Sequence, residues 1–210
     1  MFDAIQKKSL ANGVYDQLCG HIVSGSLPVG DTLPAERALA ERLGVSRPAV
    51  REGLKRLEQA GLISIQQGGS TRVLDYRQHG GLELLGPLMF SPEGEVDTGV
   101  VRGVIELRAH LGTLVARQAA ERHTRFEVER VRDTVASMMA AFGNVAALQQ
   151  HALEFWRAMV ACSHNVALQL AFNSLVRSYT GVMEQTRDLV ADEVSALADY
   201  TRLLTAVEAS

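Results

Sequence analysis

The sequence predicts a mainly α-helical protein with two domains, a small mixed domain followed by an all-helical one. Of its 210 residues, 47% are hydrophobic and only 5% are aromatic. That composition is sufficient for a buried core and is typical of a helical protein. Strand signals are confined to one stretch that ends near residue 76, and apolar residues at helical spacing fill the remainder. We therefore predict domains at residues 1–76 and 77–210, with the segment DYRQHGG at 75–81 as the linker.

Three helices are expected in the first domain. The first spans residues 8–24, where apolar residues recur every four positions at Leu10, Val14, Leu18 and Ile22. The second has Pro34 in its first turn and ends at Gly44, which suits a C-terminal cap. The third has Ser46 as its N-cap and closes at Gly61.

A short strand pair is expected directly after the third helix. The segment LISIQQGGSTRVLDY places apolar and β-branched residues on both sides of a Gln-Gln-Gly-Gly-Ser turn, which predicts a small hairpin. Two helices joined by a short turn and followed by a hairpin form the order of a winged helix-turn-helix. The first domain is therefore predicted to have this fold.

The second domain is predicted to be a bundle of helices. We expect helices near residues 80–90, 97–122, 124–142, 145–162, 165–190 and 192–208. The second of these has a broad apolar face made of Val101, Val104, Ile105, Leu107, Leu111, Leu114 and Val115. We find no internal repeat and no apolar run of the roughly 18 residues that a membrane span requires.

Positive charge is concentrated in the third helix. Residues 1–76 carry nine Lys/Arg and eight Asp/Glu, a net charge of +1, whereas the remainder carries 12 basic and 16 acidic residues, a net charge of −4. Within residues 46–56 four basic residues stand against one acidic residue, Glu52. Such a local excess is expected where one helix meets DNA phosphates. The alternative is a solvated basic face on an ordinary helical protein.

The candidate DNA-binding residues follow from the geometry of the helix-turn-helix, whose third helix enters the major groove by its N-terminal end. Arg47 and Arg51 project from one face of that end, and each guanidinium can bind guanine through two hydrogen bonds. Further candidates are Arg37 in the preceding helix, Ser46 at the helix start, and the hairpin tip, Gln67 and Gly68. Lys55, Arg56 and Arg72 are expected to contact phosphates or to lie on the surface.

The stretch LPAERALAERLGVSRPAVREGLKRLEQAGLISIQQGG resembles the DNA-binding domain of the GntR family of bacterial transcription regulators, and the helical region after it resembles the FadR-type effector domain. The resemblance implies a homodimer on a pseudo-palindromic operator, with a small ligand that tunes DNA affinity. It also implies DNA contacts from Arg37, Arg47, Arg51 and the Gln67–Gly68 tip. Subfamily members carry a further helix after DYTRLLTAVEAS, so we expect a shortened or differently closed domain here.

The same resemblance bears on cofactors. Many members of the subfamily hold a divalent metal with one Asp and three His, two of which form a D-x-x-x-H pair. Here Ala152 and Trp156 occupy that pair's positions, so we expect neither a metal nor another cofactor. His151 and His164 are predicted to be a surface residue and a helix-end residue.

The metal-free branch of the subfamily binds long-chain acyl-CoA, which makes an apolar lining the expected form of an effector site. Candidates from this resemblance are Phe155, Trp156 and Tyr179, with Leu107, Leu111 and Met159, although each is equally explained as core. Arg108 lies on the apolar helix and needs a partner. That partner is either an anionic group of the ligand or an acidic side chain.

Taken together, the sequence predicts a cytoplasmic, ligand-responsive transcription regulator and not an enzyme. Its six histidines and its scattered carboxylates form no recognisable catalytic set, and Cys19 and Cys162 are expected to be reduced thiols. The preferred effector is an acyl-CoA or fatty acid, and the alternative is a small organic acid from sugar or carboxylate catabolism. A helical enzyme and an adaptor bundle that binds no nucleic acid remain as competing classes.

Overall fold

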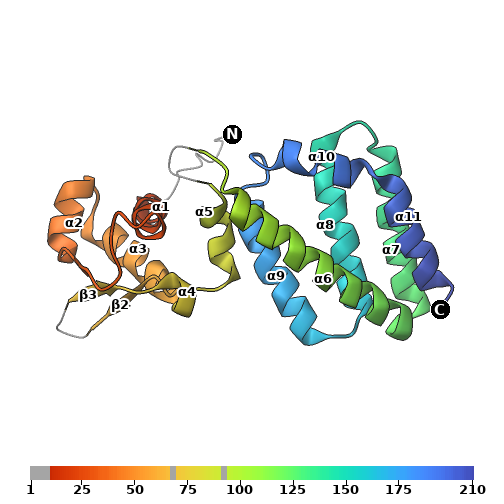
Figure 1. Cartoon of the computed structure of the whole chain (residues 1–210), viewed down its shortest axis with the longest axis horizontal. Helices are drawn as coiled ribbons and strands as arrows, with labels where there is room; N and C mark the ends of the chain where they lie inside the picture. The colour runs from red at the N-terminus through yellow and green to blue at the C-terminus, as the bar shows by residue number, and fades with distance from the viewer. Residues whose placement is uncertain (1–9, 67–69, 91–93) are drawn as a thin grey trace, which may run out of the picture. The chain divides into compact units, whose positions relative to one another are not determined.

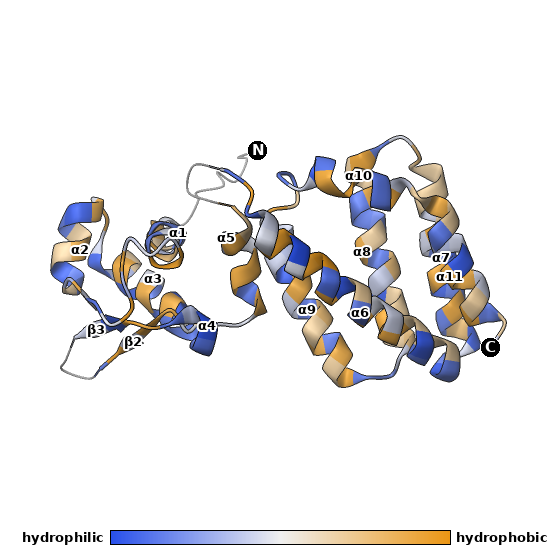
Figure 2. Ribbon diagram, viewed as in Figure 1, coloured by the Kyte–Doolittle hydropathy of each residue, from blue (hydrophilic) through white to orange (hydrophobic). Residues whose placement is uncertain are grey.

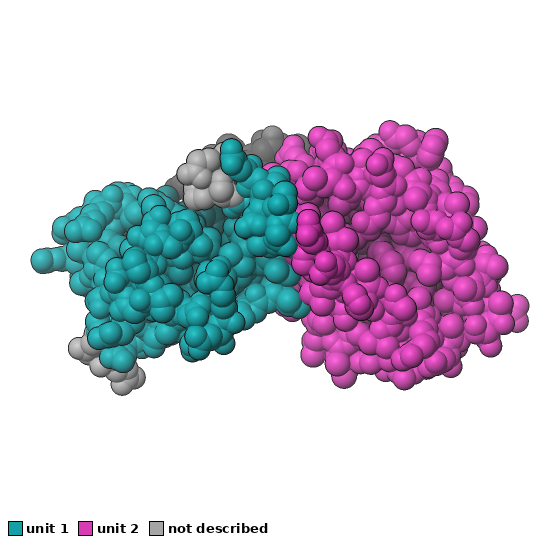
Figure 3. Space-filling view, viewed as in Figure 1, with its two compact units in different colours: residues 1–100 teal, residues 101–210 magenta. Residues whose placement is uncertain are grey.

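The computed structural model describes residues 10–66, 70–90 and 94–210. The chain divides into two compact units, residues 1–100 and 101–210 (Figure 3). The sequence placed the division between residues 76 and 77. The compact first unit extends further because Leu84 is buried in its core and Leu88 packs against that core.

The first unit contains the helices and strands of a winged helix-turn-helix (Figure 1). In chain order these are α1 Leu10–Val23, β1 Thr32–Leu33, α2 Glu36–Leu43, α3 Arg47–Gln59, β2 Ile63–Ile65 and β3 Thr71–Val73. The strands form one antiparallel sheet in the order β1-β3-β2, with Thr32 opposite Arg72 and Ile63 opposite Val73. The predicted fold is confirmed, although the two-residue strand β1 was not foreseen.

The turn between α2 and α3 has the predicted form. Gly44 ends α2 in the left-handed conformation at φ 64°, where its N–H donates to the carbonyl oxygen of Ala40. Glycine is favoured here because it has no Cβ to clash in this conformation. Ser46 is the N-cap of α3 in extended backbone conformation, and its side chain makes no capping hydrogen bond within the described residues. Pro34 precedes α2, which begins at Glu36, so its predicted place in the first helical turn was wrong.

The core of the first unit lies between α1 and α3. Val50, Leu54 and Leu57 of α3 are buried against the apolar face of α1. Gly53 allows this close approach, because a Cβ added there would lie 2.7 Å from Cγ1 of Val14 and 3.2 Å from the carbonyl oxygen of Ala11. The buried faces of the two helices thereby fix which face of α3 points to solvent.

The predicted linker and the helix expected at 80–90 form three short helical segments instead. They are α4 Tyr76–His79, the 3₁₀ helix η1 Leu82–Leu84 and α5 Leu85–Met89. Asp75 caps α4 by accepting a hydrogen bond from the backbone N–H of Arg77. Gly80 and Gly81 then separate α4 from η1, so a single continuous helix does not form.

The second unit is all-helical, as predicted. Its helices are α6 Thr98–Arg122, α7 Arg125–Ala140, α8 Val145–Cys162, α9 Val166–Thr180, α10 Arg187–Ser195 and α11 Leu197–Glu208. The first three residues of α6, Thr98 to Val100, fall in the first unit. Helix α8 supplies the centre of the core through Leu148, Phe155 and Met159, all fully buried. Among the described residues, no helix is both long and apolar enough to cross a membrane.

One expected helix was too long. The helix predicted over 165–190 ends at Thr180, and α10 starts at Arg187. The buried side chain of Gln149 explains the break, because its amide donates to the hydroxyl oxygen of Tyr179 at 2.8 Å and to the carbonyl oxygen of Met183 at 3.1 Å. The turn between α9 and α10 is therefore held by a buried polar group rather than by an uninterrupted helix.

The close packing of α1 on α3 can be tested with Gly53→Ala. We expect this variant to lose about 1–3 kcal/mol of unfolding free energy by overpacking, which outweighs the better helix propensity of alanine. Urea unfolding followed by circular dichroism measures the loss. As a control, Gly20→Ala in α1 adds a Cβ that meets nothing within 4 Å, and it should stabilise the protein by roughly 0.5–1 kcal/mol. A Gly53→Ala protein as stable as the control would contradict the packing.

Candidate nucleic-acid interface and effector domain

Helix α3 has one buried and one basic face. Val50, Leu54 and Leu57 are buried, whereas Arg47, Arg51 and Lys55 are exposed. The three basic residues are spaced by four, so their side chains form one row along the solvent face. This row is the basic surface that the sequence predicted at the start of the helix.

Arg51 is held in place by a residue from α2. Its Nε donates to Oε1 of Glu36 at 3.1 Å and its Nη2 donates to Oε2 at 2.8 Å. The hydrogen bonds from Arg51 lower the pKa of the Glu36 carboxyl, and the nearby charges of Arg47 and Lys55 lower it further. Glu36 is therefore an anion among three cations. Sequence reasoning did not identify it as part of the site.

The other predicted DNA-binding residues that the structure describes lie near the start of α3 or on α2. Ser46 is exposed at the N-cap of α3. Arg37 is 81% exposed on α2, with a long contact of 3.9 Å to Glu41 one helical turn away. Gln67 and Gly68 lie outside the described residues.

Arg56 has a structural role that the sequence did not reveal. Its guanidinium stacks on the ring of Tyr15 at 4.7 Å from the ring centroid, and it donates a hydrogen bond to Oδ1 of Asn12. Both partners lie on α1, so Arg56 joins α1 to α3. Arg72, by contrast, is exposed on β3, in agreement with its prediction as a phosphate-contacting or surface residue.

In the second unit, the predicted effector residues occupy different environments. Phe155 is fully buried and packs edge-to-face against Trp156 and Tyr200, with ring centroids 5.6 and 5.0 Å apart. Trp156 is half-buried, and its ring lies against Gly112 of α6. Tyr179 is half-buried, with its hydroxyl oxygen bonded to Gln149. Phe155 is thus a core residue, whereas Trp156 and Tyr179 retain some exposure.

Arg108 forms an ion pair between helices. Its Nη2 lies 2.6 Å from Oε1 of Glu193 on α10, and both side chains are partly exposed. This pair corresponds to the acidic-side-chain alternative for Arg108. Burial raises the pKa of the nearby Tyr200, an effect that the charge of Glu193 reinforces and that of Arg108 opposes. Tyr200 therefore lies close to both members of the pair, although the sequence gave no signal for it.

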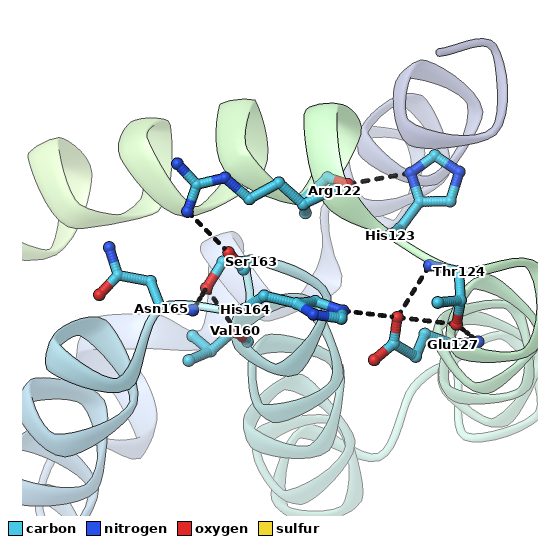
Figure 4. Close-up of polar contacts among 9 residues, drawn as sticks. Arg122, His123, Thr124, Glu127, Val160, Ser163, His164 and Asn165 are labelled. Atoms are coloured by element: carbon cyan, nitrogen blue, oxygen red, sulfur yellow. Dashed lines mark hydrogen bonds and ion pairs between the residues drawn. The ribbon is translucent and has the colours of Figure 1, made fainter.

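The two histidines considered as metal ligands lie on α8 or directly after its end. His151 is half-buried on α8. His164 follows the end of α8 in a left-handed conformation at φ 50°, and its Nε2 lies 3.0 Å from Oε2 of Glu127 (Figure 4). Within residues 10–66, 70–90 and 94–210, no three His, Cys, Asp or Glu side chains form a group that could hold a metal ion.

Both cysteines are buried free thiols. Desolvation raises the pKa of Cys19 to about 11 and that of Cys162 to about 11. Such thiols remain protonated at neutral pH and are poor nucleophiles.

The geometry defines a class of protein, a winged helix-turn-helix joined to an all-helical domain, with a row of exposed basic residues on the recognition helix. Residues 10–73 match the family described as bacterial regulatory proteins, gntR family, and residues 103–210 match the FCD domain. The chain belongs to the gntR family of transcription regulators.

Named relatives agree with this assignment. The chain is 36% identical to the HTH-type transcriptional regulator Mce2R of Mycobacterium tuberculosis, over 97% of this chain and 84% of the relative. It is 27% identical to the fatty acid metabolism regulator protein of Yersinia enterocolitica, over 96% of this chain and 82% of that protein. The solved structure of Lar, which controls expression of the Listeria monocytogenes agr system, has the same fold, with 14% identity, a TM-score of 0.56, and coverage of 100% of this chain and 94% of Lar.

The contact between Glu127 and His164 predicts a pH-dependent contribution to stability. Glu127 completes a capping box with Thr124 at the start of α7 (Figure 4). Burial acts to raise the pKa of Glu127, but hydrogen bonds from His164 and Thr124 outweigh it and lower that pKa below 4.5. A carboxyl with a depressed folded-state pKa stabilises the fold above its unfolded pKa, and the contribution is lost as the pH falls through the folded value.

We expect Glu127→Gln to lower the unfolding free energy at pH 7 by up to about 1 kcal/mol, because glutamine keeps the capping box but loses the charge that strengthens the contacts with His164 and Thr124. The difference from wild type should shrink as the pH falls below 4.5, the ordinary pKa of the group. Urea unfolding between about pH 3 and pH 7 measures both effects, because this range covers the titration of a single carboxyl. Glu121→Gln is the control, because Glu121 makes a long exposed contact with Arg117. If the difference in unfolding free energy between wild type and Glu127→Gln did not change with pH, the lowered pKa of Glu127 would be wrong.

Proposed function

We propose that the protein is a dimeric transcription regulator that binds a specific operator and releases or retains it in response to a small ligand. The observation that carries this proposal is the row of Arg47, Arg51 and Lys55 on the exposed face of α3, in a chain of the gntR family. A regulator of this kind acts in the cytoplasm, where the DNA lies. Its family consists of transcription regulators, which argues against an enzymatic role.

The basic residues divide into two roles by their position. Arg47 and Arg51, in the first turns of α3, face the bases when the helix enters the major groove by its N-terminal end. Lys55 lies further along the row and neutralises phosphate. Arg37 and the hydroxyl of Ser46 add contacts beside them. The family resemblance extends the proposed DNA-binding set to Gln67 and Gly68, which lie outside the described residues.

Dimerisation is supported by apolar surface on the second unit. Of the broad apolar face predicted for α6, Val115 alone is buried within the described residues, and Ile105 is 56% exposed. On α9, Val166 and Leu170 are exposed as well. Hydrophobic segments along both helices are visible in Figure 2. Exposed apolar surface of this kind marks interaction sites in soluble proteins, and a second copy of the chain fits the operator symmetry expected of the family.

For the effector we propose an acyl-CoA or fatty acid. The support is the named similarity to fatty acid metabolism regulators, together with two half-exposed aromatic residues, Trp156, which packs on Phe155, and Tyr179, which is bonded to Gln149. A small organic acid is the second candidate, and the observation in its favour is Arg108. The partly exposed guanidinium of Arg108 already binds one carboxylate, that of Glu193.

DNA recognition is tested by selecting duplexes from a random 30-base-pair library (about three helical turns) with the wild-type protein. Arg51→Ala should then lower the ratio of affinity for the selected duplex to that for a scrambled one by roughly 5–150-fold, the value of one lost bidentate base contact. Wild-type binding should also fall steeply with salt concentration, since phosphate contacts release counterions. Arg117→Ala, an exposed arginine of α6, is the control and should bind as wild type. Unchanged discrimination in Arg51→Ala would remove Arg51 from the reading surface.

Native mass spectrometry of the purified protein tests the dimer and the effector together. We expect a species of twice the chain mass of 22.8 kDa, with an added mass equal to an acyl-CoA or fatty acid. A monomer at micromolar concentration would contradict the proposed dimer. Palmitoyl-CoA and a small dicarboxylate are then added separately to the apoprotein. If only the dicarboxylate binds and changes the DNA affinity, the acyl effector is wrong and the organic acid takes its place.

A further inference from the structure

Glu36 is the one acidic side chain within the described residues that bonds to an arginine of the α3 row, and it uses both of its oxygens to do so. It lies in the first turn of α2, and Arg51 lies in the second turn of α3, fifteen residues later in the chain. The fixed turn at Gly44 and the apolar contacts of both helices set this spacing. The pair is therefore built by the helix-turn-helix itself.

The atoms used in the pair leave the reading edge of Arg51 free. A guanidinium has five N–H groups, one on Nε and two on each Nη. Glu36 takes the side formed by Nε and Nη2. The end of the group presents one Nη1 proton and the second Nη2 proton, and this pair of donors has the geometry needed to bind O6 and N7 of guanine. Arg51 can thus hold Glu36 on one edge and a base on the other.

Such a pair restricts the motion of a long side chain. A free arginine loses much of its rotamer entropy when it is immobilised on a base. Two hydrogen bonds from a carboxylate that is itself on a helix reduce this cost before DNA arrives. The net energy of a pair whose arginine is 57% exposed is small. Its value is therefore in orientation rather than in fold stability.

We propose that Glu36 is a positioning residue that presents the free edge of Arg51 to a guanine in the major groove, and so determines base specificity at that position. This inference rests on the proposed DNA-binding function. Because Glu36 is negative and lies among Arg47, Arg51 and Lys55, it also opposes nonspecific attraction of phosphate to this surface. The charge acts on all duplexes alike, so the ratio of specific to nonspecific binding depends on the positioning of Arg51.

The experiment uses the duplex selected by the wild-type protein, all single-base variants of that duplex, and a scrambled duplex. Glu36→Ala should lower the specific-to-nonspecific ratio about 3–10-fold, part of the value of a bidentate contact. The relaxed base position should be the one that Arg51→Ala also relaxes, with the other positions unchanged. Affinity for the scrambled duplex should stay the same or rise.

Three further variants complete the design. Glu36→Gln keeps the size of the side chain and one acceptor oxygen, so it should give an intermediate ratio and remain informative if Glu36→Ala folds poorly. Glu52→Ala removes the same charge from the exposed face of α3 and should leave the ratio as in wild type. In an Arg51→Ala background, Glu36→Ala should change the ratio by less than about twofold, since coupled residues are non-additive.

The outcomes separate this inference from the proposed function. If Glu36→Ala binds the selected duplex more tightly and discriminates as well as wild type, Glu36 competes with DNA for Arg51, and the positioning role is wrong. The positioning role is also wrong if the relaxed position differs from that of Arg51→Ala. If the wild-type protein selects no sequence from the library, the proposed DNA-binding function itself fails.

Discussion

The packing of α1 against α3 is the contact on which the rest of the first unit depends. Val14 of α1 approaches α3 so closely that Gly53 is required opposite it. With Val50, Leu54 and Leu57 turned toward α1, helical periodicity places Arg47, Arg51 and Lys55 on an adjoining, exposed side of α3. The packing of the α1–α3 core therefore determines which side chains of α3 are exposed and can contact another molecule. Arg56 strengthens the same contact through Tyr15 and Asn12, so a basic residue adjacent to the row contributes to the fold and is withdrawn from the binding surface.

Because three basic side chains share one exposed side of α3, their mutual repulsion must be offset. Three cations on one exposed helix face repel one another, and Glu36 is placed where it offsets that repulsion and bonds to Arg51. An exposed ion pair stabilises a fold by only about 0–1 kcal/mol. Its larger effect is geometric, because a side chain with fewer accessible rotamers loses less entropy on binding. The positioning of Arg51 thus favours a surface that binds DNA selectively over one that binds any polyanion.

Much of this organisation could be predicted from sequence, and the misses share a physical cause. The helices, the turn at Gly44 and the basic face of α3 follow from local periodicity and capping. The roles of Glu36 and Arg56 depend on partners fifteen and forty-four residues away. For Arg108 an acidic partner was one of two expected alternatives, but its identity, Glu193, lies eighty-five residues away. Residue spacing within one helix carries no information on such partners. The break near Thr180 was missed for the same reason, since it depends on the buried amide of Gln149.

The energies involved also constrain what an effector must do. For the small organic acid proposed as the second candidate, binding at Arg108 requires competition with the carboxylate of Glu193. Because that pair is partly exposed, breaking it changes the free energy of the domain by no more than about 1 kcal/mol. A switch from 1:99 to 99:1 between two states requires about 5.5 kcal/mol of differential binding. Burying a single methylene contributes about 0.8 kcal/mol, so an acyl chain of roughly seven carbons supplies this difference only where the chain is buried in one of the two states and exposed in the other. A compact carboxylate must obtain it from many polar contacts instead. The proposed effector, whichever its class, must therefore make most of its contacts in only one of the two states.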